Sequence, residues 1–592
     1  MPEDGERSVL NRKKSQNVHY MSIPINRGSE GEIYDELHQQ DGSHRRNLFD
    51  QPIGSFKGVN SLGRFASSLR RANSFMNIDV GPDKERTYLK DGQDALFDPY
   101  TLAPSADGRR LSHAVAGRGG LSLRPSMSEL YDDGALFDEQ DSITVPGTIF
   151  PQDEIASRRP TLSFQDLDGN IDPDAHSIIL KKVENKDGKI VTLLAGQSTA
   201  PQTVFNSVNI LIGIGLFALP LGLRYAGLIV GIPMLAIFAF TAFYTAELIS
   251  RCQDEDPTMI SYGDLGYAAF GSKGRAFISF LFTIDLLSSG VALMIIFGDS
   301  LNVLFPKYSV TFFKLVAFFA ILPQTLAPLN VLSTFSLLGI VSTLGTVFCI
   351  AFCGLYKTSS PGSLVDIMSP PLWPQNMTNF GLAVGILSAC WGGHAVFPNL
   401  KSDMRHPAKY RNCLKTTFAI TASADISTAV LGILMFGVSV KDEVTKSLQL
   451  TPGYPRFIYV LISALMTLIP IAKTALTTRP INAVLDVTMG ITTSQPGSDG
   501  SLPRSKRIIS SFNGLLINAI IIGISILFPE FDKFIAFVGA GLCFTICGLL
   551  PCIFYMTICS ETITSWEKIV CTIIILFSVV LSIFGVGAAI IA

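Results

Sequence analysis

The chain has 592 residues and a formal net charge of −2, and its mean hydropathy of +0.38 is high for a soluble protein. The near-zero charge gives no sign of nucleic-acid binding, so no nucleic-acid partner is expected. Charged residues are concentrated in the first 200 positions and the remainder is apolar, which predicts a soluble tail followed by an all-α integral membrane domain. The opening MPEDGERSVLNRKK lacks the apolar core of a signal peptide, so internal segments should direct insertion.

The tail has two predicted parts. Residues 1–165 are rich in Ser, Arg, Asp and Gly and show no sustained helical or strand period, which predicts a disordered cytosolic regulatory tail. Within it, RRANSF and RRPTLSF place arginine three positions before Ser74 and Thr161. This spacing suits kinases that read arginine, so we expect phosphorylation there by protein kinases; plain solvated charge is the alternative. In 166–200, two β-rich runs flank an Asp-Gly pair, which predicts a β-hairpin and a lead-in.

The membrane domain, 201–592, contains apolar segments long enough to cross a bilayer, which takes about 20 residues each. The predicted spans, with ten or twelve also compatible with the pattern, are 203–223, 226–250, 276–304, 309–326, 330–356, 378–399, 413–437, 456–478, 508–528, 534–556 and 568–591. The bias of Lys and Arg in the short loops predicts that the tail is cytosolic and the C-terminus lies on the other side. No spacing of Cys and His suits a metal, and neither disulfides nor cofactors are expected.

The first and sixth spans contain residues that weaken a helix. One includes VNILIGIGLFALP and the other SACWGGHAVFP. In each, a glycine is followed five residues later by proline, and a second glycine lies just upstream. Glycine costs roughly 1 kcal/mol relative to alanine in a helix interior, and proline about 3 kcal/mol. We therefore expect both spans to be broken within the membrane; the alternative is that the glycines merely allow close helix packing.

Broken spans at matching positions of two halves are the best indication in a sequence of a carrier's central site. Unwinding leaves amides and carbonyls without helical partners, which is tolerated only where the segment lines a cavity. The amides at the start of a half-helix attract a carboxylate, and the carbonyls attract an ammonium group or a cation. A zwitterionic amino acid carries both kinds of group.

Charged residues within predicted spans are expensive in lipid and are candidates for function. Glu247 and Asp299 lie near span ends, where snorkelling or packing is expected. The deeper ones are Asp285, Asp425 and Lys473. His394 lies beside the second break and could titrate with protons, although a packing histidine is an equal alternative.

These residues resemble the amino acid/auxin permease family. QTVFNSVNILIGIGLFALPLGLRYAG is similar to that family's first-span motif, and DMRHPAKYRNC to its stretch after span six. GQST and AKTALTTRPI are closest to its vacuolar branch. The resemblance covers roughly 190–592. It implies eleven spans in a five-plus-five inverted repeat with helices one and six broken, and, in the fungal vacuolar branch, import of neutral amino acids into the vacuole in exchange for luminal protons.

The resemblance also implies roles for particular residues. The substrate would be bound by Asn209, Gly213, Ile214 and Gly215 in span one and by Trp391, Gly392, Gly393 and His394 in span six. Lys473 lies near the depth at which sodium-coupled relatives have a span-eight hydroxyl, and a protonated amine could replace sodium there. The candidates for proton coupling are therefore Lys473, Asp285 and His394, while Thr474 and Thr477 leave a sodium site open.

Other functions remain as alternatives. A proton- or sodium-coupled amino acid symporter at another membrane fits the same pattern, and so does a nutrient receptor that signals through its tail. An ion channel is disfavoured because no repeated selectivity-filter loop is evident. A primary pump is excluded because the G-x-x-x-x-G-K-[ST] phosphate loop is missing. Catalysis has no support, because the lone span histidine has no nucleophile and acid at useful spacing.

Overall fold

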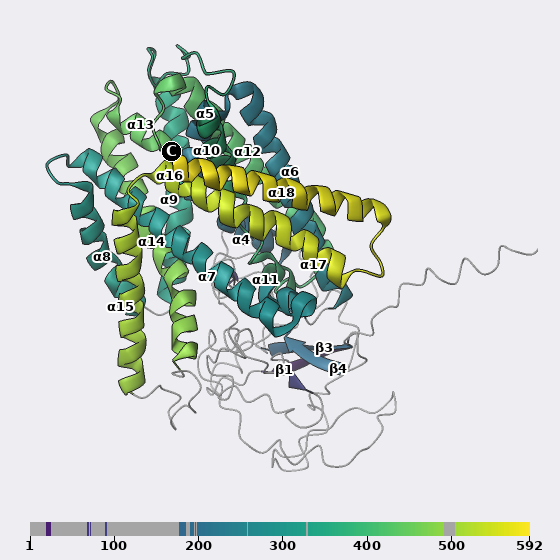
Figure 1. Cartoon of the computed structure of the whole chain (residues 1–592). Coiled ribbons are helices and arrows are strands. Elements are labelled where there is room, and N and C mark those ends of the chain that lie inside the picture. Colours follow the sequence, from purple (N-terminus) through teal and green to yellow (C-terminus); the bar gives the residue numbers. More distant parts are fainter. Residues whose placement is uncertain are drawn as a thin grey trace, which may run out of the picture.

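The computed structural model describes most of the C-terminal two thirds of the chain and a few segments nearer the N-terminus. The described residues are 196–489 and 504–592 apart from 197, 257–258 and 327–328, four strands, and Ser68, Leu69 and Ala72. They form a bundle of long helices with a small sheet at one end (Figure 1). Most of the predicted 1–165 tail lies outside the described residues, as do the predicted phosphorylation sites Ser74 and Thr161.

The sheet has four antiparallel strands in the order β1-β3-β4-β2. Its strands are β1 (His19–Pro24), β2 (Leu89–Lys90), β3 (Ser177–Glu184) and β4 (Ile190–Leu194). β3 and β4 pair with each other on either side of residues 185–189, where the Asp-Gly pair stands in the sequence. β1 and β2 come from the tail and pair along the two edges of this hairpin. Their partners are far away in sequence, so no local pattern indicated them.

Eight helices among the described residues are long and apolar enough to cross a bilayer, and a bent pair, α4 with α5, raises the number to nine. The long helices are α6 (Leu228–Glu255), α7 (Tyr262–Leu304), α9 (Leu329–Tyr356), α12 (Tyr410–Phe436), α14 (Arg456–Thr488), α15 (Arg504–Leu527), α18 (Ser565–Ile591), and the continuous run of α16 (Phe531–Val538), the π-helical η6 (Gly539–Leu549) and α17 (Leu550–Ile558). Spans predicted at 309–326 and 378–399 correspond to shorter apolar helices. The chain is therefore a membrane protein whose membrane domain is all-helical.

Four further elements are shorter than these long helices. They are α8 (Val310–Leu326), η4 (Pro407–Lys409), η5 (Gly437–Ser439) and α13 (Val444–Leu450).

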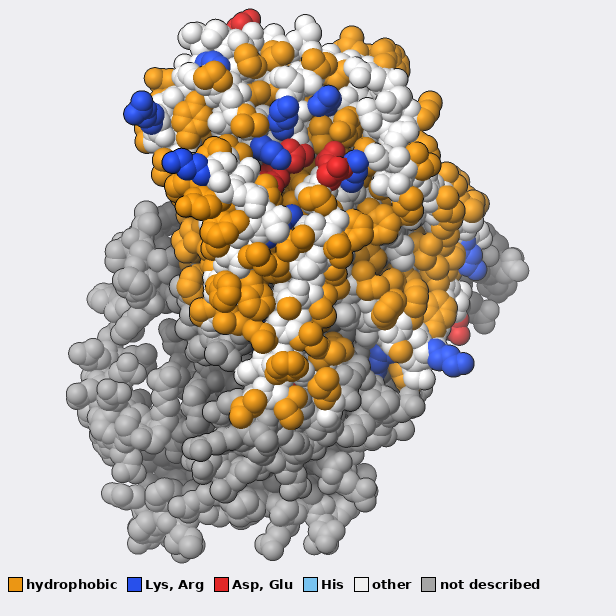
Figure 2. Space-filling view, turned by 60° about the vertical axis from the view of Figure 1, so that its left-hand side comes forward, with side chains coloured by type: hydrophobic (Ala, Val, Ile, Leu, Met, Phe, Trp, Pro, Cys, Tyr) orange, Lys and Arg blue, Asp and Glu red, His pale blue; other side chains and the backbone are white. Residues whose placement is uncertain are grey.

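Large apolar side chains project outward from the bundle, and Phe240, Phe319 and Phe348 are each about 70% exposed. Figure 2 shows that hydrophobic side chains cover most of the described face. Such a surface is rare on a soluble protein and suits contact with lipid tails.

α7 begins fourteen residues before the predicted span at 276–304. Ser261 and Asp264 form a capping box, in which each side chain accepts a hydrogen bond from the backbone N–H of the other. Lys273 and Arg275 make this first stretch too polar to be recognised as membrane helix, and Gly271, with φ of 69°, interrupts it before the apolar part. The predicted span therefore began too late, because capping and not hydropathy starts the helix.

The predicted breaks in the first and sixth spans are present. The first span consists of α4 (Ala200–Leu211), η2 (Ile214–Ala218) and α5 (Leu219–Ala226), and its two halves are bent by 52°. The sixth consists of α10 (Met377–Ser388), η3 (Ala389–Trp391) and α11 (Phe397–Ser402). α4 packs against α11, α5 against α10, and η2 against η3. The two broken spans therefore run in opposite directions with their breaks side by side.

Candidate substrate and coupling site

The first break begins where α4 ends. The Ile212 N–H still donates to the Val208 carbonyl at 2.8 Å, but Ile212 has a ψ of 90°, and Gly213 is extended with φ −105° and ψ −167°. Ile214 then opens η2, which runs directly into α5. Asn209, on the last turn of α4, has a buried Oδ1 with no hydrogen-bond partner among the described residues. The break thus combines a non-helical backbone with an unpaired side-chain acceptor.

The second break has a similar geometry. η3 ends at Trp391, and Gly392 has φ −77° and ψ 90°, close to the values at Ile212. The Trp391 ring is buried and nearly parallel to that of Phe418 in α12, with a centroid separation of 6.2 Å and an interplanar angle of 13°. Its Nε1 has no hydrogen-bond partner among the described residues. A buried donor is therefore available on this side.

The four glycines of the two breaks divide into two pairs. A Cβ on Gly213 would approach only the Leu211 carbonyl, at 3.8 Å, and one on Gly392 only the Ala389 carbonyl, also at 3.8 Å. These two positions therefore border open space. By contrast, a Cβ on Gly215 would lie 3.2 Å from the Cys390 Sγ, and one on Gly393 would lie 2.9 Å from Leu211. The second pair allows the two broken spans to cross closely.

Lys473 of α14 reaches the first break. Its Nζ donates a hydrogen bond to the Ile212 carbonyl at 3.0 Å, and its aliphatic stem lies against Gly339 of α9. The amine is therefore directed at the unwound backbone of span one. Thr474 and Thr477 donate their hydroxyl protons to carbonyls of their own helix, at 2.7 Å and 2.8 Å.

His394 is fully buried and is held by α6. Its Nε2 lies 3.0 Å from both the Thr245 Oγ1 and the Ala242 carbonyl oxygen. The carbonyl can only accept, so this geometry favours the tautomer with the proton on Nε2. Its Nδ1 has no partner among the described residues. The side chain thus packs against α6 through Nε2.

The two deeper carboxylates belong to different helices. Asp285 of α7 is near Cys547 of η6. Asp425 of α12 is buried close to Cys390, the residue that Gly215 contacts. Although Asp425 was noted as a charged span residue, it was not assigned to the site. Its proximity depends on how α12 faces η3, which hydropathy does not show.

The end of the bundle that carries α13 has a second charged group, which we call the α13 cluster: Asp299, Lys314, Asp442, Glu443 and Lys446. Lys446 lies 3.0 Å from Asp299 and 2.9 Å from Asp442, so Asp299 is ion-paired and not snorkelling. The Lys314 Nζ donates to the Ser525 carbonyl at 2.5 Å and is almost fully buried. Sequence reasoning missed Lys314, although a lone cation in the predicted span 309–326 was a sufficient signal.

Glu443 should make stability depend on pH. Burial raises the pKa of this carboxyl well above its ordinary value, and nearby Asp299 and Asp442 add to the effect. The folded chain therefore holds the proton more tightly than the unfolded chain, so stability is complete in acid and falls as pH rises above the unfolded pKa. We expect the melting temperature of the wild type in detergent to fall between pH 5 and pH 8, and that of Glu443→Gln to fall less. Equal slopes for both proteins would contradict this.

At the opposite end, Glu247 is also ion-paired. It lies 2.7 Å from Arg251 and 3.0 Å from Arg411, and Arg251 also pairs with Glu567 at 2.7 Å. These contacts tie α6 to α12 and α18, which supports a packing role for Glu247. Among the described residues, no group of three or more His, Cys, Asp or Glu could hold a metal ion.

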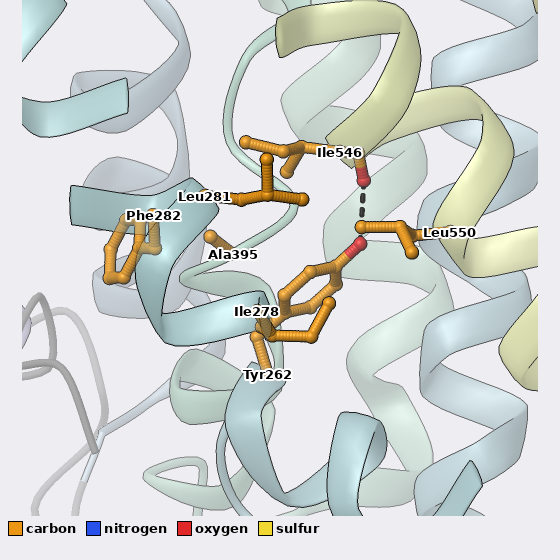
Figure 3. A pocket seen from close by; sticks show the side chains of 7 residues that line it. All are labelled: Tyr262, Ile278, Leu281, Phe282, Ala395, Ile546 and Leu550. Atoms are coloured by element: carbon orange, nitrogen blue, oxygen red, sulfur yellow. Dashed lines mark hydrogen bonds between the residues drawn. The ribbon is translucent and has the colours of Figure 1, made fainter. Parts of the chain in front are cut away.

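A small apolar pocket lies beside the second break (Figure 3). Its lining side chains come from α7, from the segment between η3 and α11, from η6 and from α17. They are Tyr262, Ile278, Leu281, Phe282, Ala395, Ile546 and Leu550. The single polar group, the Tyr262 hydroxyl, already donates to the Ile546 carbonyl at 2.6 Å. This pocket offers no partner to a carboxylate or an ammonium group, so it is not the candidate site.

The family model for transmembrane amino acid transporter proteins matches residues 196–591, which include both breaks and Lys473. The chain belongs to this family. A transmembrane amino acid transporter is not an enzyme, which agrees with the lack of a catalytic constellation in the sequence.

Individual relatives agree with this assignment. The amino acid transporter AVT1I of Arabidopsis thaliana is 30% identical over 406 residues, covering 66% of this transporter and 93% of that protein. AVT1E of the same plant is 29% identical over 403 residues, covering 66% and 73%. Among solved structures, the nucleobase-cation-symport-1 family transporter Mhp1 matches 66% of this chain and 90% of its own, at 11% identity and a TM-score of 0.39. That last similarity is too low to support a conclusion.

Proposed function

We propose that this transporter exchanges neutral amino acids for protons and so loads the vacuole, with residues 1–165 as a cytosolic regulatory tail and a luminal C-terminus. In this proposal residues 201–592 form eleven spans, with α8 and the α10–α11 pair counted as spans, arranged as a five-plus-five inverted repeat. The repeat is supported by the opposite directions of the two broken spans. The vacuolar location rests on the resemblance to the vacuolar branch.

The substrate would lie between the two breaks. The open positions at Gly213 and Gly392 leave room for it, and the amides that begin η2 would bind its carboxylate. The Asn209 Oδ1 and the Trp391 Nε1, which have no hydrogen-bond partner among the described residues, are available to its polar groups. Four further residues complete the proposed site because they lie where the two spans cross: Ile214, Gly215, Gly393 and His394. A neutral side chain suits the apolar surroundings of Phe418 and Leu211.

The hydrogen bond from Lys473 to the Ile212 carbonyl is the observation that carries the proposal. A charged amine stabilises this carbonyl in one conformation of the break, and loss of the proton weakens the bond. Proton binding and substrate binding then act on the same bistable element, which couples the two. Asp285 and His394 are the next candidates for the proton site.

Uptake by purified protein in liposomes tests the function. We expect a panel of neutral amino acids to accumulate when the interior is acidic, without sodium, and each substrate to dissipate the imposed pH gradient. Accumulation that needs sodium, or that needs acid on the same side as the substrate, would instead support the symporter. Binding without any uptake would support the receptor.

A further inference from the structure

One short piece of the tail lies within the core of the transporter. Ser68 and Leu69 are each 1% exposed and Ala72 is 3% exposed, and Ala72 belongs to the same hydrophobic cluster as the broken spans. These residues precede α4 by about 130 positions in the sequence. Ala72 is therefore packed among the buried side chains of the helical bundle.

The contact surface joins the two broken spans. The Asn206 Nδ2 of α4 donates to the Ser68 Oγ at 2.8 Å, and the Ser68 and Ser198 hydroxyls are 2.9 Å apart. The Ser198 Oγ in turn donates to the Asp403 carboxylate, just after α11, at 2.5 Å. We call this surface, made of Ser198, Asn206 and Asp403, the tail-side seam.

Backbone bonds hold the seam together. The Ser198 N–H donates to the Asp403 carbonyl at 2.7 Å, and the Arg405 N–H donates to the Ser198 carbonyl at 2.9 Å. The start of span one and the end of span six are therefore joined at the end of the bundle that Ser68 contacts. From Asn206 to the break at Ile212 is about 9 Å along the helix. A segment docked here lies over the tail-side approach to the candidate site.

We propose that Ser68, Leu69 and Ala72 act as an intramolecular ligand of the tail-side seam, and that they must leave before the carrier opens on the cytosolic side. The cytosolic direction rests on the orientation proposed above, whereas the docking itself does not. Opening of this side would separate α4 from α11. Ser68 accepts a hydrogen bond from Asn206 of α4, and it reaches Asp403 at the end of α11 through Ser198. Docking therefore favours the closed state of this side.

The sequence offers a way to release the segment. Ser74, in RRANSF, stands two positions after Ala72, with arginine three positions before it. A phosphate there adds a charge of about −1.5 to −2. We expect such a charge, two positions along the chain from the buried Ala72, to disfavour docking. Phosphorylation of Ser74 would then open the path from the cytosol.

Cysteine cross-linking in the full chain tests the docking. All ten native cysteines lie from Cys252 onward, so a Ser68→Cys change introduces the sole cysteine of the tail. The second change, Asn206→Cys, provides the partner for a disulfide bond, and a protease site inserted at residue 120 allows the tail to be cut from the membrane domain. After mild oxidation and cleavage, the disulfide should keep the two fragments together on a non-reducing gel. Ser68→Cys alone and Ser105→Cys with Asn206→Cys are the controls. No cross-link in the pair, or equal cross-links in the controls, would overturn the proposal.

Uptake in liposomes tests the effect on transport. We expect the cross-linked pair to take up substrate roughly tenfold more slowly than the same protein after reduction. Leu69→Asp should raise the initial rate without changing the half-saturating concentration, because a buried carboxylate opposes docking, while the matched tail change Leu102→Asp should not. Ser74→Asp should lower the cross-linking yield. Equal uptake rates before and after reduction would overturn the gating role. A protein that transports no amino acid in any form would contradict the proposed function, and the docking would then be tested by the cross-linking result alone.

Discussion

The Lys473→Met variant is expected to lose accumulation of amino acid driven by a pH gradient while it still exchanges amino acid across the membrane. Methionine has a similar length but cannot donate the hydrogen bond that Lys473 makes to the Ile212 carbonyl at 3.0 Å. A pH difference of one unit supplies about 1.4 kcal/mol for each proton moved, which corresponds to a tenfold concentration ratio. The wild type should approach that ratio, and the variant should equilibrate at equal concentrations on both sides.

Two controls make this result specific. Lys533→Met removes a lysine that pairs with Glu530 at the surface, at 2.5 Å, far from either break in sequence, and should accumulate substrate normally. Counterflow of labelled amino acid into preloaded liposomes at equal pH should persist in Lys473→Met, which shows that the protein is folded. If Lys473→Met and Lys473→Ala both accumulate substrate with the normal pH dependence, Lys473 does not couple protons, and Asp285, His394 and Asp425 become the residues to test.

Valine at Gly215 should abolish uptake for a different reason from valine at Gly213. At Gly215 even a Cβ would lie 3.2 Å from the Cys390 Sγ and 3.7 Å from its backbone nitrogen, so the larger side chain would force the two breaks apart. Overpacking of this kind costs about 1–3 kcal/mol. At Gly213 the side chain meets open space and would fill the room proposed for the substrate. We therefore expect a lower melting temperature for Gly215→Val and a wild-type one for Gly213→Val, with uptake lost in both.

A second-site change distinguishes these mechanisms. Cys390→Ala removes the sulfur that faces Gly215, so it should restore part of the stability and uptake of Gly215→Val but nothing to Gly213→Val. Gly587→Val is the control, because no atom lies within 4 Å of a Cβ there. Normal uptake by both single variants would refute a substrate site at the breaks.

The breaks in spans one and six could be predicted because glycine and proline act locally on the helix that contains them. The start of α7 could not be recognised from hydropathy, because a capping box and not apolar character begins it. Nor could the sequence separate Gly213 from Gly215, since the difference lies in which residue faces η3 across the crossing. The docking of Ser68 depends on partners more than 100 residues away, and no period in the tail indicates it.

The position of Trp391 has an optical consequence. The chain has three tryptophans, and Trp373 and Trp566 are 62% and 72% exposed, whereas Trp391 is 1% exposed beside the second break. In a Trp373→Phe, Trp566→Phe background, intrinsic fluorescence comes from Trp391 alone. Its Nε1 has no hydrogen-bond partner in the part of the chain that the structure describes, and its ring stacks on Phe418, so its emission wavelength should respond to a polar group arriving between the breaks. The fluorescence of Trp391 should therefore report whether substrate is bound between the breaks, and the measurement needs neither a label nor a pH gradient.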